Sequence, residues 1–206
     1  MKVLLVNGSP HEKGCTYTTL CEAQKVFKQN GIEAEIYWIG NKPIAGCIGC
    51  GACRKLGKCC FEDSVNEFAE KAKSADGFIF GSPVHYAAAG GAITAFMDRA
   101  FYSNGANMRG KPATSVVSCR RGGASAAFDQ MNKYYTINCM PIVSSNYWNQ
   151  IHGNTPEETL QDAEGIQTIQ VLANNMSWLL KCIELGKQNG FPFPQPPAKT
   201  ATNFIR

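Results

Sequence analysis

The chain opens with Met1-Lys2-Val3-Leu4-Leu5-Val6-Asn7-Gly8-Ser9-Pro10, an apolar run that ends in a small polar turn. A short apolar run before a helical pattern predicts a buried strand of a parallel sheet. Comparable runs recur at 33–38, 77–80, 114–118 and 141–145, and helical patterns lie between or after them at 16–29, 64–74, 91–102, 124–138 and 156–187. This alternation predicts an α/β fold with five parallel strands and helices on both faces of the sheet.

Length and composition narrow the class of protein. The 206 residues suit one domain, and the formal net charge of +4 without a concentrated basic stripe argues against a nucleic-acid partner. No apolar run approaches the ~20 residues that span a bilayer, and the first run is shorter than the ~7–15 apolar residues of a signal peptide. We therefore expect a cytoplasmic protein without a membrane partner, whose ten cysteines serve metal or redox chemistry rather than disulfides.

The domain organisation follows from the same patterns. Residues 1–190 are expected to form one domain that contains a cysteine-rich loop at 47–60. The segment 191–206 begins with Phe-Pro-Phe-Pro-Gln-Pro-Pro, which cannot be helical because proline lacks the N–H donor. We expect it to lie extended on the surface or on a neighbouring subunit. Ser64 followed by Glu67 resembles a capping box and predicts a helix start there.

The loops after strands one, three and four are expected to meet, because ligands of such sheets bind at the carboxyl ends of the strands. In the first loop, 7–16, the hydroxyls of Ser9 and Thr16 and the free amides of the helix start can hold a phosphate, and Gly8 and Gly14 let the backbone approach it. The loop lacks the glycine pattern of dinucleotide sites and the G-K-[ST] of triphosphate sites, so a monophosphate fits best. An ordinary strand-to-helix turn is the alternative.

The second loop, 81–87, is expected to border a flat ring. Pro83 stiffens this loop, and His85 and Tyr86 can pack along the edge of the ring. In the alternative interpretation, the loop is merely rich in glycine and Tyr86 covers the core.

The third loop, 118–123, carries two arginines and two glycines after a buried strand. Arg120 and Arg121 at a strand's carboxyl end place positive charge over the crevice, where a guanidinium can stabilise a ring that becomes negative on reduction. A solvated arginine pair is the alternative.

The motifs Asn7-Gly8-Ser9-Pro10, Gly81-Ser82-Pro83-Val84-His85-Tyr86 and Phe96-Met97-Asp98-Arg99, in this order, resemble the NAD(P)H-dependent FMN reductase branch of the flavodoxin-like superfamily. The resemblance covers roughly residues 1–150. It implies a flavodoxin-like three-layer sandwich with a five-stranded parallel sheet in the order 2-1-3-4-5, and FMN as the cofactor. Cys15 departs from the asparagine that the family often has before the threonine, which puts one phosphate contact in doubt.

The resemblance also implies which residues surround the FMN. They are Ser9, His11, Gly14, Cys15 and Thr16 in the first loop, Pro83, Val84, His85 and Tyr86 in the second, and Ser118, Cys119, Arg120, Arg121, Gly122 and Gly123 in the third. The flavin performs the chemistry, so no residue is assigned as a general acid or base, and His85 and Tyr86 are the nearest candidates. A homodimer or homotetramer is implied, and residues 146–149 with His152 are expected to wall the pocket.

The cysteine-rich loop has the spacing C-x2-C-x2-C-x5-C, which lets one loop surround a metal centre. Ferredoxins use a related run for three ligands of a 4Fe–4S cluster, whereas zinc sites more often combine two separated C-x2-C pairs. The loop is similar to that of the iron–sulfur flavoproteins, and this resemblance implies Cys47, Cys50, Cys53 and Cys59 as cluster ligands, with Cys60 competing for the fourth position. A cluster, zinc, reduced thiols and a redox-active pair all remain open.

Two functions follow from these resemblances. The first is an FMN-dependent oxidoreductase that passes electrons from NAD(P)H through FMN to a quinone, a flavin or another small acceptor. The alternative is an iron–sulfur flavoprotein that carries electrons between a ferredoxin-like donor and an acceptor through a 4Fe–4S cluster and FMN. A regulator that binds no flavin is disfavoured, because all three loops are present. NADH and NADPH stay equal alternatives, and the partner is a small-molecule or redox-protein acceptor.

Overall fold

The computed structural model describes residues 1–195, 197–198, 200–202 and 204. Five strands form a parallel sheet in the order β2-β1-β3-β5-β6. Their bounds are Lys2–Asn7 for β1, Glu33–Trp38 for β2, Gly77–His85 for β3, Ala113–Cys119 for β5 and Gln150–His152 for β6. Numbered along the chain, these strands have the expected order 2-1-3-4-5, which is confirmed. The prediction missed β4 (Ala88–Ala89), a two-residue strand that pairs antiparallel with the end of β3.

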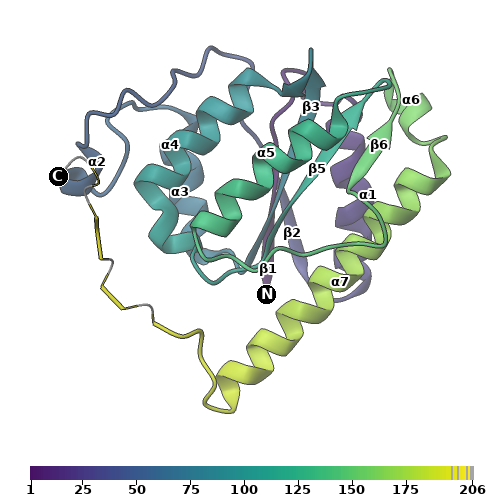
Figure 1. Ribbon diagram of the computed structural model, residues 1–206. Helices are drawn as coiled ribbons and strands as arrows, with labels where there is room; N and C mark the ends of the chain where they lie inside the picture. Colours follow the sequence, from purple (N-terminus) through teal and green to yellow (C-terminus); the bar gives the residue numbers. More distant parts are fainter. Residues whose placement is uncertain (196, 199, 203, 205–206) are drawn as a thin grey trace.

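Helices cover both faces of the sheet, so the domain has three layers (Figure 1). One face carries α1 (Cys15–Gln29) and α7 (Ala163–Gln188). The other face carries α3 (Ser64–Ser74), α4 (Gly91–Met108) and α5 (Ala124–Ile137). Two short helices lie outside these layers, α2 (Cys53–Leu56) in the cysteine-rich loop and α6 (Pro156–Thr159) before α7.

The alternation of side chains along β1 explains why both faces are covered. Leu4 and Val6 enter the core beneath α3, α4 and α5, whereas Val3 and Leu5 enter the core beneath α1 and α7. All four side chains are completely buried. Since successive residues of a strand point to opposite faces, a continuous apolar run requires a helix layer on each side.

The fifth strand was predicted at 141–145 and lies instead at β6. In the predicted segment only Ile142 forms a bridge, to Ala113 at the start of β5. Further along, Asn149 places its side chain in the sheet, and its amide nitrogen donates to the Thr114 hydroxyl at 2.9 Å and to the Ser115 carbonyl at 3.1 Å. The Asn149 side chain thus bonds the Ser115 carbonyl, a backbone group that a neighbouring strand would otherwise bond. Regular pairing with β5 therefore begins only at β6.

One predicted cap and one predicted helix are wrong. Helix α3 has the predicted bounds, but its N-cap is Asp63 and not Ser64, because the Asp63 carboxylate accepts the Val65 amide at 3.1 Å. The helix predicted over 156–187 is two helices, α6 and α7, and the Asp162 side chain caps the second by accepting the Gly165 amide at 2.9 Å. Asp is a favoured N-cap residue, so each carboxylate fixes where its helix begins.

The proline-rich tail starts beside the end of the sheet at which the parallel strands begin. At Gly110 an added Cβ would lie 2.7 Å from the ring of Phe193, so this ring packs on that glycine. Residues 196, 199, 203 and 205–206 of the predicted tail lie outside the described residues. None of the described helices carries an apolar stretch of the length that crosses a bilayer.

Candidate functional site

Three loops meet at the carboxyl ends of β1, β3 and β5. The sheet register places Asn7 beside Gly81 and Pro83 beside Ser118. The Gly8 amide donates to the Gly81 carbonyl at 2.9 Å, which joins the first loop to the second. Loops that begin at neighbouring strand ends form the ligand crevice of a parallel sheet, so the expected site is assembled here.

The first loop leads into the uncapped end of α1. Gly14 occupies the N-cap position and supplies no side-chain acceptor, and the first intrahelical bond that closes the turn runs from Thr18 to the Gly14 carbonyl. The backbone amides of Cys15, Thr16 and Tyr17 have no hydrogen-bond acceptor among the described residues. Free amides at a helix start, with the positive end of the helix dipole, favour an anion such as a phosphate.

The predicted hydroxyl ligands shape this loop from inside. Ser9 is buried, and its hydroxyl accepts the His11 amide at 3.1 Å. Thr16 is 1% exposed, and its hydroxyl lies 2.8 Å from that of Ser118, which joins the first loop to the third. A hydroxyl has one donor and two acceptor positions, so Thr16 can accept from Ser118 and still donate to a phosphate.

The second loop is a small hairpin that projects from the sheet. Tyr86, at its turn, has the left-handed φ of +58° and is fully exposed, so the alternative in which Tyr86 covers the core is wrong. His85 is exposed beside it, whereas Pro83 and Val84 are half-buried. A tyrosine held at positive φ is strained, and such strain is concentrated at functional sites.

The third loop lies against the second. At Gly123, which has φ +89° and is the N-cap of α5, an added Cβ would lie 2.8 Å from Val84 Cγ1. Only glycine tolerates both this backbone conformation and this close approach. Arg120 and Arg121 are exposed, and Cys119 is buried, which raises the pKa of its thiol. The two arginine side chains are therefore accessible to an anionic ligand.

An open hollow of about 610 Å³ lies over the first loop. Its wall includes His11, Gly14 and Cys15, as expected, and also residues that the sequence interpretation missed: Trp38, Asn41, Asn154, Thr155 and Pro156. The indole nitrogen of Trp38 donates to the Ser9 carbonyl at 2.8 Å, so the end of β2 supports the loop. Position was an available signal only for Trp38, which ends the predicted strand 33–38, because Asn154 follows β6, a strand that the sequence did not locate.

The predicted wall at 146–149 and His152 belongs to another depression. Tyr147 and His152 line a hollow of about 150 Å³ with Asp162. Asp162 Oδ2 accepts both the backbone amide of His152 at 2.7 Å and its ring Nδ1 at 3.2 Å. Neither Tyr147 nor His152 lines the hollow over the first loop.

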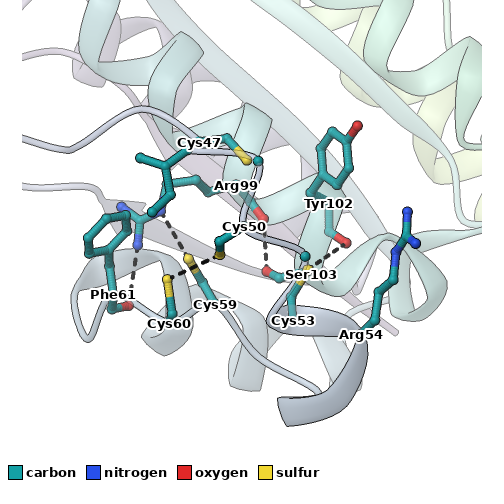
Figure 2. A pocket seen from close by; sticks show the side chains of 13 residues that line it. Cys47, Cys50, Cys53, Arg54, Cys59, Cys60, Phe61, Arg99, Tyr102 and Ser103 are labelled. Carbon is teal, nitrogen blue, oxygen red and sulfur yellow. Dashed lines mark hydrogen bonds between the residues drawn. The ribbon is translucent and has the colours of Figure 1, made fainter.

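The cysteine-rich loop surrounds a second cavity, of about 160 Å³, on the α4 side of the molecule (Figure 2). Five cysteines line it: Cys47, Cys50, Cys53, Cys59 and Cys60. Arg99, Tyr102 and Ser103 of α4 line it too, and the Cys53 thiol lies 3.9 Å from the Tyr102 carbonyl. The loop thus gathers its sulfur atoms against one helix.

Two of these thiols contact each other. The sulfur atoms of Cys50 and Cys60 are 3.7 Å apart and both residues are exposed. The amide of Ala52, and next the Cys60 thiol, lower the pKa of Cys50. The Cys50 thiol in turn raises the pKa of Cys60. Of this pair, Cys50 is the sulfur that ionises first.

Cys59 differs from the other four cysteines because it is buried, with 8% of its surface exposed. Its sulfur accepts the Arg99 Nε–H at 3.2 Å. Its backbone amide donates to the Asn66 side chain and its carbonyl accepts from that side chain, both at 3.0 Å. Cys59 is therefore fixed to α3 and α4.

The donors around this cavity are cysteine sulfurs, the ligand type shared by zinc sites and iron–sulfur clusters. Among the residues that the structure describes, no three His, Cys, Asp or Glu side chains lie close enough together to hold one metal ion. Five cysteines line one hollow, so the four thiol donors that a 4Fe–4S cluster needs are present in one loop.

A parallel sheet in this strand order, with three loops at its carboxyl edge and an uncapped helix start, defines a flavodoxin-like fold. The chain belongs to the NADPH-dependent FMN reductase family, whose model matches residues 1–154.

Individual proteins agree with this assignment. The chain is 32% identical over 192 residues to an iron–sulfur flavoprotein of Methanocaldococcus jannaschii, covering 89% of this chain and 100% of that protein. It is 30% identical to an iron–sulfur flavoprotein of Methanosarcina thermophila, covering 89% and 97%. Among solved structures it resembles FerB, an NAD(P)H:(acceptor) oxidoreductase of Paracoccus denitrificans, with a TM-score of 0.64 at 16% identity, covering 88% and 97%.

Proposed function

We propose that this oxidoreductase transfers electrons between FMN, bound at the three loops, and a 4Fe–4S cluster, bound in the cysteine-rich loop. The observation that carries the proposal is the placement of five cysteines around one cavity beside α4. The relatives named iron–sulfur flavoproteins, which match nearly the whole chain, support it. When bound, the flavin supplies exchange of one or two electrons and the cluster supplies exchange of single electrons.

The first loop would hold the FMN phosphate. The free amides at the start of α1 would donate to that anion. The Thr16 hydroxyl would donate to it as well, because accepting a hydrogen bond from Ser118 leaves its O–H available. Ser9 holds the loop in shape through the His11 amide. The loop has room for one phosphate and no second glycine-rich turn for a pyrophosphate, which favours FMN over FAD.

The second and third loops would border the ring. Pro83 and Val84 offer apolar surface, and the exposed Tyr86 can lie along one edge. Arg120 and Arg121 would stabilise negative charge near N1 of the reduced flavin. No side chain in these loops is assigned as a general acid or base.

The cluster ligands would be Cys47, Cys50, Cys53 and Cys59. Cys60 lines the same cavity but is exposed and contacts Cys50, whereas Cys59 is buried and held by α3 and α4. Four thiolates in one loop repel one another unless a cation neutralises them, so cluster binding would stabilise the loop.

A second function is the oxidation of NAD(P)H, with a quinone, a flavin or another small molecule as acceptor. The family match and the similarity to FerB favour it. The hollow over the first loop is open and Tyr86 is fully exposed, so a co-substrate would have access to a flavin bound there. Both functions use the same flavin, and they differ in whether electrons arrive as a hydride or singly.

The assembly and the compartment belong to the same proposal. Large exposed side chains such as Tyr86, Tyr102 and Trp178 are suited to burial between subunits, which fits a homodimer or homotetramer. A cytoplasmic location fits free thiols and an iron–sulfur centre, because a reducing compartment preserves both.

The test is to purify the protein without oxygen and to quantify iron, sulfide and flavin. We expect non-covalent FMN, about four irons for each chain, and broad absorption beneath the flavin bands. Cys50→Ala is expected to remove the iron and this absorption while FMN stays bound. The matched control is Cys182→Ala, an exposed cysteine of α7, which is expected to keep both.

Two results would contradict the proposal. Recovery of FAD, or of no flavin after reconstitution, contradicts the FMN site. Absence of iron from reconstituted wild-type protein contradicts the cluster, and rapid NADH or NADPH oxidation by that protein would leave the second function standing.

A further inference from the structure

Arg99 is the largest completely buried side chain of the described residues, and each of its five N–H donors has an acceptor. Nε–H donates to Cys59 Sγ at 3.2 Å. One terminal nitrogen donates to the Ala45 carbonyl at 3.3 Å and to Asp63 Oδ2 at 2.6 Å. The other donates to the Phe61 carbonyl at 3.3 Å and to Asp63 Oδ1 at 2.8 Å. The guanidinium therefore has one orientation, with its Nε–H on the sulfur.

The acceptors lie at both ends of the cysteine-rich loop. Ala45 lies two residues before the first cysteine of the loop and Phe61 directly after the last, so one guanidinium joins the two ends. The bond to the Phe61 carbonyl can be followed in Figure 2. The Phe61 ring also lies against the charge, 4.9 Å from the guanidinium carbon. Both ends of the cysteine-rich loop are therefore held against α4.

The charge balance shows what the arrangement is suited to. Asp63 pairs with Arg99 in a bidentate ion pair and accepts the Val65 amide as the N-cap of α3. One carboxylate, that of Asp63, neutralises the buried cation and accepts two of its N–H groups. Two backbone carbonyls accept two more, and the fifth donor, Nε–H, is directed at the Cys59 sulfur. Hydrogen bonds to the sulfurs of a cluster help to set its reduction potential, because they stabilise the extra negative charge of the reduced form.

We propose that Arg99 is a positioning residue for the cluster, which fixes the Cys59 sulfur as the fourth ligand in preference to Cys60 and makes the cluster easier to reduce. The inference rests on the proposed function, since it requires that the loop binds a cluster. Among the described residues Arg99 donates a hydrogen bond to Cys59 and none to Cys60, so the two adjacent cysteines differ in the support they receive.

Lysine is the informative replacement at Arg99. It keeps the positive charge but lacks the planar set of five donors, so it cannot bond the two loop ends, the carboxylate and the sulfur together. Substitutions in the groups that support metal ligands commonly weaken metal binding about 10–100-fold. Arg99→Lys is therefore expected to release iron to a chelator at least about tenfold faster, and to shift the cluster midpoint potential to a more negative value.

The experiment uses anaerobically purified, FMN-loaded protein. Iron content is measured chemically, and the cluster potential is measured by redox titration followed by electron paramagnetic resonance. Cys60→Ser is the matched control, expected to keep the iron and the wild-type potential, whereas Cys59→Ser is expected to lose most of the iron. In the Arg99→Lys background this preference is expected to disappear, so that Cys59→Ser and Cys60→Ser lose similar amounts of iron.

The outcomes separate the inference from the proposed function. Wild-type protein that cannot be loaded with iron overturns the cluster and this inference with it. Wild-type protein that loads, with an Arg99→Lys variant of unchanged potential and unchanged preference for Cys59, overturns the inference alone. If Arg99→Lys does not retain FMN or unfold cooperatively, Asp63→Asn takes its place, because it removes the carboxylate that orients the guanidinium; loss of the preference for Cys59 over Cys60 is expected, and an unchanged preference overturns the inference.

Discussion

Replacing Thr16 with valine tests whether one buried hydroxyl both joins two loops and binds the phosphate. Thr16 is 1% exposed and Ser118 is 5% exposed, and their hydroxyl oxygens are 2.8 Å apart. Valine has nearly the shape of threonine, so the change removes the hydroxyl with little change in packing. In the variant, the buried Ser118 hydroxyl loses the partner that the structure gives it.

The buried hydrogen bond between Thr16 and Ser118 sets the expected loss of stability. A buried hydroxyl left without its partner costs about 1–3 kcal/mol, so Thr16→Val is expected to lower the free energy of unfolding of the flavin-free protein by that amount. Ser118→Ala removes the other half of the pair, and the double variant should show a coupling of about 1 kcal/mol. FMN binding separates the two variants, because only Thr16 can also donate to the phosphate. Thr16→Val is expected to weaken FMN binding about tenfold more than Ser118→Ala.

The assays are urea unfolding of the flavin-free protein and titration of FMN followed by its fluorescence. Thr18→Val is the matched control, since the Thr18 hydroxyl donates to the Gly14 carbonyl within the first turn of α1. It is expected to change FMN binding little. A coupling near zero between Thr16 and Ser118 would refute the hydrogen bond. Equal dissociation constants for Thr16→Val and Ser118→Ala would refute the phosphate contact.

Three further predictions concern the same two sites. Replacing Arg120 and Arg121 together with alanine is expected to lower the FMN midpoint potential, and an unchanged potential in a folded, flavin-loaded variant would show them to be surface charges. Gly8→Ala places a Cβ 2.6 Å from a side-chain carbon of α4, so a loss of about 1–3 kcal/mol in urea unfolding is expected, and wild-type stability would contradict the packing. In metal-free protein, Cys50 should react with iodoacetamide at lower pH than Cys60, because its pKa is lowered and that of Cys60 is raised; mass spectrometry that finds the reverse order would contradict the assignment.

The sequence predicted the elements whose signals are local. Short runs rich in apolar residues located β1, β2, β3 and β5, and the family resemblance implied the strand order that the sheet has. The fifth strand was misplaced because its position depends on a contact distant in sequence. Asn149 bonds Thr114 and Ser115, some 35 residues away, and no apolar pattern records that exchange of a side chain for strand backbone.

In the candidate site too, local patterns were predictable from the sequence and contacts between distant residues were not. The cysteine spacing was sufficient to predict that Cys47, Cys50, Cys53 and Cys59 lie around one cavity, since residues within a few positions of one another can surround one centre. The role of Arg99 was not predictable, because Phe96-Met97-Asp98-Arg99 served only as a family motif in the sequence. Arg99 meets Asp63 and Cys59 across separations of 36 and 40 residues. Only the packing of α3 against α4 brings these groups together.

Helix α4 connects the two sites. It begins just after the hairpin of the second loop, where Ile93 packs so closely on Gly8 that a Cβ there would lie 2.6 Å away. Arg99, where the same helix holds the cysteine-rich loop, is eight residues beyond Gly91, a rise of about 12 Å. A helix fixed at both points keeps a constant separation, whereas a flexible connection would let it vary. The glycine of the first loop and the buried arginine therefore hold the first loop and the cysteine-rich loop at a fixed distance from each other, as the proposed electron transfer requires.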